Sequence, residues 1–112
     1  MESRLPGFYK RSLDERLAAV QELVGLSASD VCTLKENTGF CSENADLMVE
    51  NAIGVFPLPM GMAANFRIDG EDMLIPMVVE EASVLAAASN AANLLRGGLG
   101  IVTESTAPIM IG

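Results

Sequence analysis

The chain has 112 residues, of which half are hydrophobic and 20% are charged, so it has enough apolar content for one folded core and is not expected to be disordered. Its net charge of -8 argues against nucleic acid or an anionic membrane surface as the main partner. The two cysteines and the absence of histidine exclude a Cys/His zinc site, and we expect no metal. Early charged residues interrupt any leader-like apolar run, and no apolar stretch is long enough to span a membrane, so a cytoplasmic protein is expected.

The first half of the chain predicts helices. Ser12 and Glu15 form a capping-box pattern, and apolar residues recur at helical spacing from 13 to 24 before Gly25. A second, short helix is expected after Ser27, which with Asp30 offers a cap. A third helix is predicted from Ser42 or Glu43 to Asn51, and its candidate buried residues are Leu47, Met48 and Ala52.

The second half predicts a β-hairpin, a helix and a strand. Apolar residues flank Asp69-Gly70, which is a strong turn signal. Pro76 restricts part of the second strand to an edge or a bulge. An alanine-rich helix is predicted over 83–96, and a final strand over Gly100–Glu104. Helices followed by a hairpin, a helix and a strand indicate an α+β fold in a single domain.

Two adjacent carboxylates, Glu80 and Glu81, stand between the second strand of the hairpin and the alanine-rich helix. Desolvation by neighbouring valines would raise the pKa of a buried glutamate toward neutrality and suit it to general acid or base chemistry. The positive end of the following helix would act in the opposite direction. The sequence leaves open which effect is larger.

Simpler interpretations exist for each of these residues. On residue pattern alone, Glu80-Glu81 is more often an ordinary acidic helix entrance, and Ser83 is then its N-cap. Asn51 is interpreted as a helix C-cap, and Asn65 as a polar position without a special role. The glycines at 97, 98 and 100 lack the following helix and the lysine that a phosphate-binding loop needs.

Five short motifs occur in order along nearly the whole chain. They are 3–8 (SRLPGF), 50–54 (ENAIG), 65–66 with 69–70 (NF and DG), 75–77 (IPM) and 79–83 (VEEAS). Their order and spacing resemble the N-terminal part of hydroxymethylglutaryl-coenzyme A (HMG-CoA) reductases of the soluble, class II type of bacteria and archaea.

The resemblance implies a role for several residues. Glu81 matches the family's catalytic glutamate, which pairs with a lysine and helps to move protons to and from the substrate oxygen. Ser83 matches a serine that contacts the hydroxymethylglutaryl group. Lys10 and Arg11 match only loosely a region near the CoA phosphates. The 50–54 motif matches the family's dimer interface, with Glu50, Asn51, Ile53 and Gly54 as its residues.

The family reaction reduces HMG-CoA to mevalonate and CoA with two NAD(H) or NADP(H) molecules. The resemblance places the family's catalytic lysine, aspartate and histidine downstream of this chain, and the cofactor-binding domain is also missing from it. We therefore expect residues 1–112 to be the N-terminal part of the substrate-binding and dimerisation domain of a homodimeric enzyme, inactive alone. The alternatives are a non-catalytic module for dimerisation or acyl-CoA binding with the same fold, and a small interaction domain with chance similarity.

Overall fold

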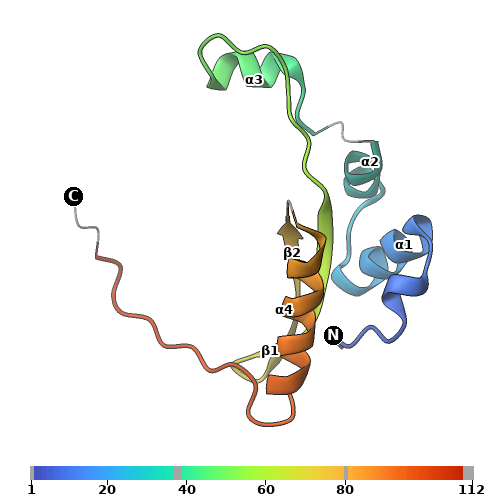
Figure 1. The fold of residues 1–112 in the computed structure, drawn as a ribbon, viewed down its shortest axis with the longest axis vertical. Coiled ribbons are helices and arrows are strands. Elements are labelled where there is room, and N and C mark those ends of the chain that lie inside the picture. The colour runs from blue at the N-terminus through green and yellow to red at the C-terminus, as the bar shows by residue number, and fades with distance from the viewer. Residues whose placement is uncertain (1, 37–38, 80, 110–112) are drawn as a thin grey trace. The chain divides into compact units, whose positions relative to one another are not determined.

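The computed structural model describes residues 2–36, 39–79 and 81–109. The chain divides into two compact units, Gly7–Leu58 and a second one made of Met1–Pro6 with Pro59–Gly112. Figure 1 labels the helices and strands of both. Helices and an antiparallel hairpin together confirm the α+β class.

The unit Gly7–Leu58 is helical. It contains a short 3-10 helix, Phe8–Lys10, followed by α1 (Leu13–Val24), α2 (Ala28–Glu36) and α3 (Ser42–Met48). The predicted capping box of α1 forms, because Glu15 N–H donates to Ser12 Oγ at 3.3 Å while Ser12 N–H donates to Glu15 Oε2 at 2.7 Å. Gly25 ends the helix in a left-handed conformation, with φ of 73°. Thus both predicted ends of α1 are confirmed.

Helix α2 has a similar reciprocal cap. Asp30 N–H donates to Ser27 Oγ at 3.1 Å, and Ser27 N–H donates to Asp30 Oδ2 at 2.8 Å. These bonds satisfy backbone donors that have no partner inside the first turn. The predicted capping of the second helix by this pair is therefore confirmed.

Helix α3 ends three residues before its predicted end at Asn51. Val49 at its C-cap has an extended backbone, with φ of −130° and ψ of 122°, so the helix cannot continue through it. The predicted burial is also wrong: Leu47 and Met48 are 86% and 73% exposed, and the buried residue is Ala45. Burial in a helix of two turns depends on what packs against it, and the sequence does not reveal that.

The second unit is built on an antiparallel hairpin of β1 (Met60–Ile68) and β2 (Glu71–Val78). The turn is at Asp69-Gly70 as predicted, and both residues have positive φ, 50° and 86°. Aspartate tolerates this region better than most residues, and glycine enters it freely. Pro76 pairs with Met62 in this two-stranded sheet, so it lies on an edge strand, where proline is acceptable.

The hairpin contains a β-bulge in β1. Ala63 pairs with Ile75 and Phe66 with Met73, so Ala64 and Asn65 together oppose one residue of β2. Asn65 has a φ of 71°, which makes it a left-handed residue inside a strand. The bulge redirects the backbone groups of both residues away from β2, where other elements bind them.

Helix α4 (Ala82–Leu95) packs along β1, as Figure 1 shows. Its less exposed residues recur every three or four positions, which is the pattern of one helix face against a sheet; they are Leu85, Ala88, Ser89, Ala92 and, just after its last residue, Arg96. Gly61 of β1 lies directly beneath Leu85, and a Cβ added at Gly61 would overlap Leu85 Cδ1. The missing side chain at Gly61 is what allows the helix to approach so closely.

We expect Gly61→Ala to destabilise the fold by about 1–3 kcal/mol, because the new methyl group overpacks against Leu85. Chemical denaturation of the single variants and of Gly61→Ala with Leu85→Ala measures the effect. The second substitution removes the overlapping atom, so the double variant should lose less stability than the sum of the two singles. Strict additivity would contradict the contact.

The predicted final strand over Gly100–Glu104 is wrong in extent. Only Ile101 forms a bridge, parallel to Ile68, with hydrogen bonds Asp69 N–H to Ile101 O and Ile101 N–H to Arg67 O, both at 2.8 Å. Ile68 is the last residue of β1, so the residues after Ile101 lie beside the turn and have no further strand residue to pair with. There Thr103 instead donates to the Asp69 carboxylate through its N–H, at 2.8 Å, and through its hydroxyl.

Candidate active site

The predicted carboxylate site lies where β2 leads into α4. Val79 N–H donates to Pro59 O at 3.2 Å, which holds the end of the hairpin closed just before the acidic pair. Glu81 then caps α4 with an extended backbone, φ of −117° and ψ of 118°. Glu80 lies outside the described residues, so the site is built on Glu81.

Glu81 and Ser83 are brought together. Ser83 N–H donates to Glu81 Oε1 at 3.2 Å, and the Ser83 hydroxyl donates to the same oxygen. These two bonds stabilise the ionised carboxylate and hold the pKa of Glu81 below its ordinary value of 4.5. Glu81 is exposed, and Val78 and Val84 beside it are 51% and 43% exposed, so desolvation does not reverse this shift.

The N-cap of α4 is Glu81 and not Ser83, which the residue pattern alone predicts. Ser83 is the expected N-cap if the site has no special function, whereas Glu81 occupies that position and accepts the N–H of Ser83. An ionised side chain at the positive end of a helix is favourable. Therefore the carboxylate in this chain is set to accept hydrogen bonds and to attract a cation, rather than to donate a proton.

We expect the carboxyl group of Glu81 to titrate below 4.5 in the chain, and Ser83→Ala to move its pKa upward. The substitution removes the hydroxyl donor but keeps the backbone N–H. Side-chain carbon NMR during a pH titration measures both values. An unchanged pKa in the Ser83→Ala variant would contradict the hydroxyl contact.

An open, largely apolar hollow of about 260 Å³ lies beside this cap. Its wall is made of Pro59, Met60, Gly61, Val79, Ala82 and Leu85. Ala82 directly follows Glu81, so an apolar hollow and a carboxylate are adjacent. Such a combination suits a ligand that has both an apolar part and a polar reacting group.

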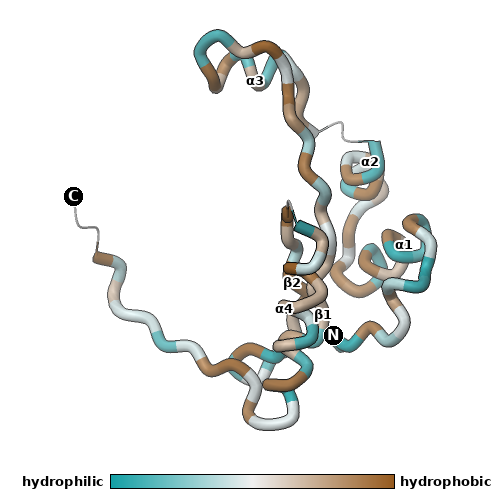
Figure 2. Tube along the Cα trace, viewed as in Figure 1, coloured by the Kyte–Doolittle hydropathy of each residue, from teal (hydrophilic) through white to brown (hydrophobic). Residues whose placement is uncertain are grey.

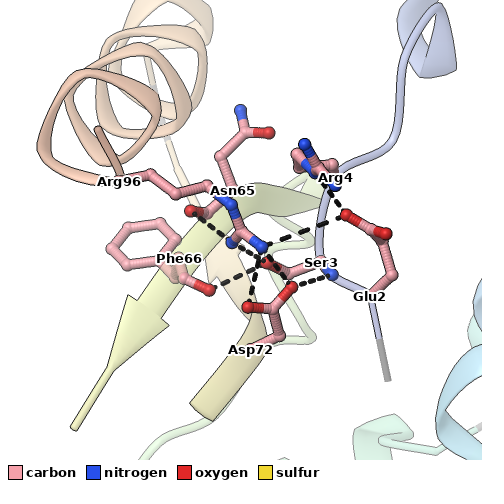
Figure 3. A network of polar contacts seen from close by, with 7 residues as sticks. All are labelled: Glu2, Ser3, Arg4, Asn65, Phe66, Asp72 and Arg96. Carbon is pink, nitrogen blue, oxygen red and sulfur yellow. Dashed lines mark hydrogen bonds and ion pairs between the residues drawn. The ribbon is translucent and has the colours of Figure 1, made fainter. Parts of the chain in front are cut away.

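The opposite end of α4 carries a polar network that the sequence analysis missed (Figure 3). The guanidinium of Arg96 donates to both carboxylate oxygens of Asp72 at 2.8 and 2.6 Å, and to Ser3 Oγ at 3.0 Å. The side chains of Arg96 and Asp72 are only 16% and 15% exposed. This pairing, together with Ser3 N–H at 2.8 Å, holds the pKa of Asp72 far below its usual range.

Asn65 is also part of this network, although the sequence analysis gave it no role. Its backbone N–H donates to Ser3 O at 2.9 Å, its carbonyl accepts from Arg96 at 3.3 Å, and its side-chain amide donates to Ser89 O at 3.1 Å. An asparagine inside a mainly apolar strand was the available signal, because asparagine is among the residues most tolerant of positive φ after glycine.

Comparison with known proteins decides the family. The family model described as hydroxymethylglutaryl-coenzyme A reductase matches residues 12–112. The reductase of Archaeoglobus fulgidus is 53% identical over 112 residues, which is all of this chain and 26% of that protein. The chain belongs to the HMG-CoA reductase family.

Structures of HMG-CoA reductase from Streptococcus pneumoniae agree. One aligns with a TM-score of 0.80 and 32% identity, covering 88% of this chain and 24% of that one. Another, described as the class II enzyme bound to NADPH in open conformations, aligns with a TM-score of 0.78 over 87% of this chain and 26% of its own. This chain thus spans about a quarter of the length of these archaeal and streptococcal reductases.

The predicted CoA-phosphate residues belong to the other unit. Lys10 ends the short 3-10 helix and its ammonium lies 5.6 Å from the centroid of the Tyr9 ring. Arg11 follows, and its N–H donates to Phe8 O at 3.1 Å. Both residues are exposed, so their positive charges are accessible at the end of this helix. Their role toward CoA stays a prediction.

The reductase-like motif 50–54 follows α3 in an irregular turn. Asn51 has a φ of 61° and Gly54 a φ of 153°, values that favour asparagine and glycine. Asn51 is not the C-cap of α3, as one interpretation held, because the helix ends at Met48. The Ile53 side chain is fully exposed, and Leu47, Met48 and Phe56 near it in sequence are at least 73% exposed; Figure 2 shows the apolar character of this stretch.

The described residues offer no cradle for a dinucleotide. Gly97, Gly98 and Gly100 follow the end of α4 and lead into extended chain, so they do not open a helix whose N–H groups would bind a pyrophosphate. Over the same residues, no group of three or more potential ligands could hold a metal ion. In the part of the chain that the structure describes, every helix is too short or too polar to cross a bilayer.

Proposed function

We propose that this chain forms part of an HMG-CoA reductase that interconverts HMG-CoA with mevalonate and CoA, using two molecules of NADH or NADPH. The observation that carries the proposal is the carboxylate of Glu81 at the entrance of α4 beside an apolar hollow. The resemblance of the motif at 79–83 to the family supports the assignment of Glu81 as the catalytic glutamate. The 53% identity to the Archaeoglobus fulgidus reductase over all 112 residues supports it.

We assign Glu81 the handling of protons at the reacting oxygen. Reduction of a thioester or aldehyde carbonyl develops negative charge on that oxygen, which needs a cation and proton donors nearby. An ionised carboxylate pairs well with such a cation, here a lysine of the family outside this chain. Proton donation by Glu81 itself requires further residues to raise its pKa, since in this chain hydrogen bonds lower it.

Ser83 is proposed to contact the hydroxymethylglutaryl group. Its hydroxyl already donates to Glu81, so it can accept a hydrogen bond from the substrate while fixing the orientation of the carboxylate. Lys10 and Arg11 are proposed to approach the CoA phosphates, where their charge would oppose the overall acidity of the chain.

We further propose that residues 1–112 are the N-terminal part of the substrate-binding and dimerisation domain, with Glu50, Asn51, Ile53 and Gly54 in a homodimer contact. A fully exposed isoleucine in a stretch with other exposed apolar side chains supports an interface there. The nicotinamide cofactor supplies hydride when bound. The chain's described residues have no fitting site for it, so we assign its binding to another part of the enzyme, and the cytoplasmic location stays a prediction.

The test is a hybrid reductase, in which residues 1–112 replace the matching quarter of the Archaeoglobus fulgidus protein. NADPH and NADH oxidation with HMG-CoA is measured by absorbance. We expect turnover within about tenfold of the parent, since the two sequences agree at more than half of all positions. A folded hybrid without turnover, beside an active parent, would exclude the catalytic proposal and leave the non-catalytic module.

The 112-residue chain alone is expected to show no oxidation of NADPH with HMG-CoA. Its described residues provide a carboxylate and a serine, whereas the resemblance places the catalytic lysine, aspartate and histidine and the cofactor-binding domain outside these 112 residues. The same assay with the hybrid reductase as the positive control measures this. Turnover by the isolated chain would show that the remaining catalytic groups are not needed.

A further inference from the structure

Helix α4 is attached to the hairpin at three places along its length. Near its start, Leu85 packs on Gly61. At its middle, Ser89 Oγ accepts from Ala64 N–H at 3.1 Å, and Ser89 O accepts from the side-chain amide of Asn65 at 3.1 Å. At its end, Arg96 binds Asp72. A helix of 14 residues is about 21 Å long, so these attachments are spread over its whole length.

The attachment at Arg96 is the strongest of the three. It is a two-pronged, charge-assisted contact between side chains that are largely shielded from water, and such bonds are stronger than those between neutral groups. The same guanidinium also reaches Ser3 Oγ and Asn65 O. It therefore joins the end of α4, the bulge of β1, the start of β2 and residues 2–6, the N-terminal arm, as Figure 3 shows.

The arm itself is held firmly. Ser3 is completely buried; its N–H donates to Asp72 Oδ2 at 2.8 Å, and its hydroxyl donates to Phe66 O at 2.8 Å. No polar side-chain atom buried in the described part of the chain lacks a partner. The network is thus fully satisfied, and a satisfied network specifies one arrangement of the elements it joins.

The rest of α4 has little side-chain bulk to fix its position. Its interior is dominated by alanine, and of its residues only Ala92 is buried. Alanine forms few dispersion contacts compared with leucine. The direction of the helix on the hairpin consequently depends on the three attachments more than on general packing.

We propose that Arg96 is a positioning residue for Glu81. Its contact with Asp72 fixes the C-terminal end of α4 on the hairpin. Glu81 caps the other end of the same helix, so its position depends on how the helix lies on the hairpin. When the contact at Arg96 is lost, only the contacts of Ser89 and Leu85 hold α4 on the hairpin, so the tilt of the helix, and with it the position of Glu81, is less restricted. This inference rests on the proposed function of Glu81.

The experiment uses the hybrid reductase with Arg96→Gln, Arg96→Lys and Asp72→Asn, at a temperature where each variant is folded by circular dichroism. A displaced catalytic carboxylate costs rate, so we expect kcat to fall at least about tenfold in Arg96→Gln and Asp72→Asn while the KM for NADPH is unchanged. Arg96→Gln and Asp72→Asn break the same contact, that between Arg96 and Asp72. The kcat of the double variant should therefore be no lower than that of the slower single variant. Arg96→Lys keeps the charge and should recover part of kcat.

Arg67→Gln is the matched control, because Arg67 is an exposed arginine of the same hairpin, and its kcat should equal that of the unaltered hybrid. An Arg96→Gln enzyme that melts at a lower temperature but keeps full kcat when folded would overturn the proposal. If Arg96→Gln does not fold, Arg96→Lys decides: a severalfold lower kcat supports positioning, and full kcat overturns it. Failure of the proposed function is separate, since it would appear as full activity of Glu81→Gln in the same hybrid.

Discussion

Glu81→Gln in the hybrid reductase is expected to lower turnover by roughly 10²–10⁴-fold without lowering the melting temperature, the size typical of a lost proton-transfer group. Glutamine has nearly the same shape as glutamate and keeps a side-chain oxygen that can accept Ser83 N–H, so the cap of α4 is preserved. The substitution removes the negative charge and the ability to bind a proton. Steady-state NADPH oxidation and thermal unfolding by circular dichroism measure the two effects.

The control is Glu104→Gln. Glu104 is also an exposed glutamate of the same unit, and it directly follows Thr103. It should change neither turnover nor stability appreciably, because isolated surface substitutions rarely do. A Glu81→Gln hybrid with near-normal turnover would remove Glu81 from the catalytic machinery. If the Glu81→Gln hybrid instead shows both a lower turnover and a lower melting temperature, Glu81 acts as a helix cap.

Asp72→Asn is expected to lower the midpoint of thermal unfolding at pH 7 by at least about 5 °C, since it removes the shielded partner of Arg96 and leaves only the half-exposed Glu2 carboxylate, 3.9 Å away. Asparagine can still accept and donate hydrogen bonds, but it does not carry the charge that both guanidinium contacts and Ser3 N–H bind. Circular dichroism melts of the 112-residue chain measure the difference between the two proteins.

The same pair predicts a definite dependence on pH. The pKa of Asp72 is depressed in the folded chain, so its stabilisation is fully present above its unfolded pKa of about 3.8 and is lost as the pH falls through the folded value. The difference between the unaltered chain and Asp72→Asn should therefore be constant from pH 7 to about 5 and shrink below about 4. A difference that stays constant down to pH 2 would contradict this assignment.

Asp14→Asn is the matched control for Asp72. Asp14 pairs with Lys35 at 2.7 Å, but the two side chains are 73% and 52% exposed, so solvent screens the interaction. We expect little change in melting temperature from this substitution at any pH between 2 and 7. The comparison separates the effect of a shielded, networked pair from that of an ordinary surface pair.

Local patterns in the sequence determined most of the elements. The cap at Ser12, the left-handed stop at Gly25 and the turn at Asp69-Gly70 each depend on a few adjacent residues, and all three are as predicted. The motifs along the chain, including the one around Glu81, are by themselves enough to indicate the family, and the family model confirms it. Interactions between residues close in sequence can be inferred from the sequence alone.

Contacts between distant residues were decided by the tertiary structure. Ser3 and Arg96 are 93 positions apart and Asp72 lies between them, so no local pattern brings them together. The final strand is only one bridge because β1 ends opposite Ile101, which is a property of the hairpin rather than of residues 100–104. The ionisation of Glu81 was likewise open in the sequence, because desolvation and hydrogen bonding oppose each other. Only the exposed position of the carboxylate and its two bonds from Ser83 decide that it stays charged.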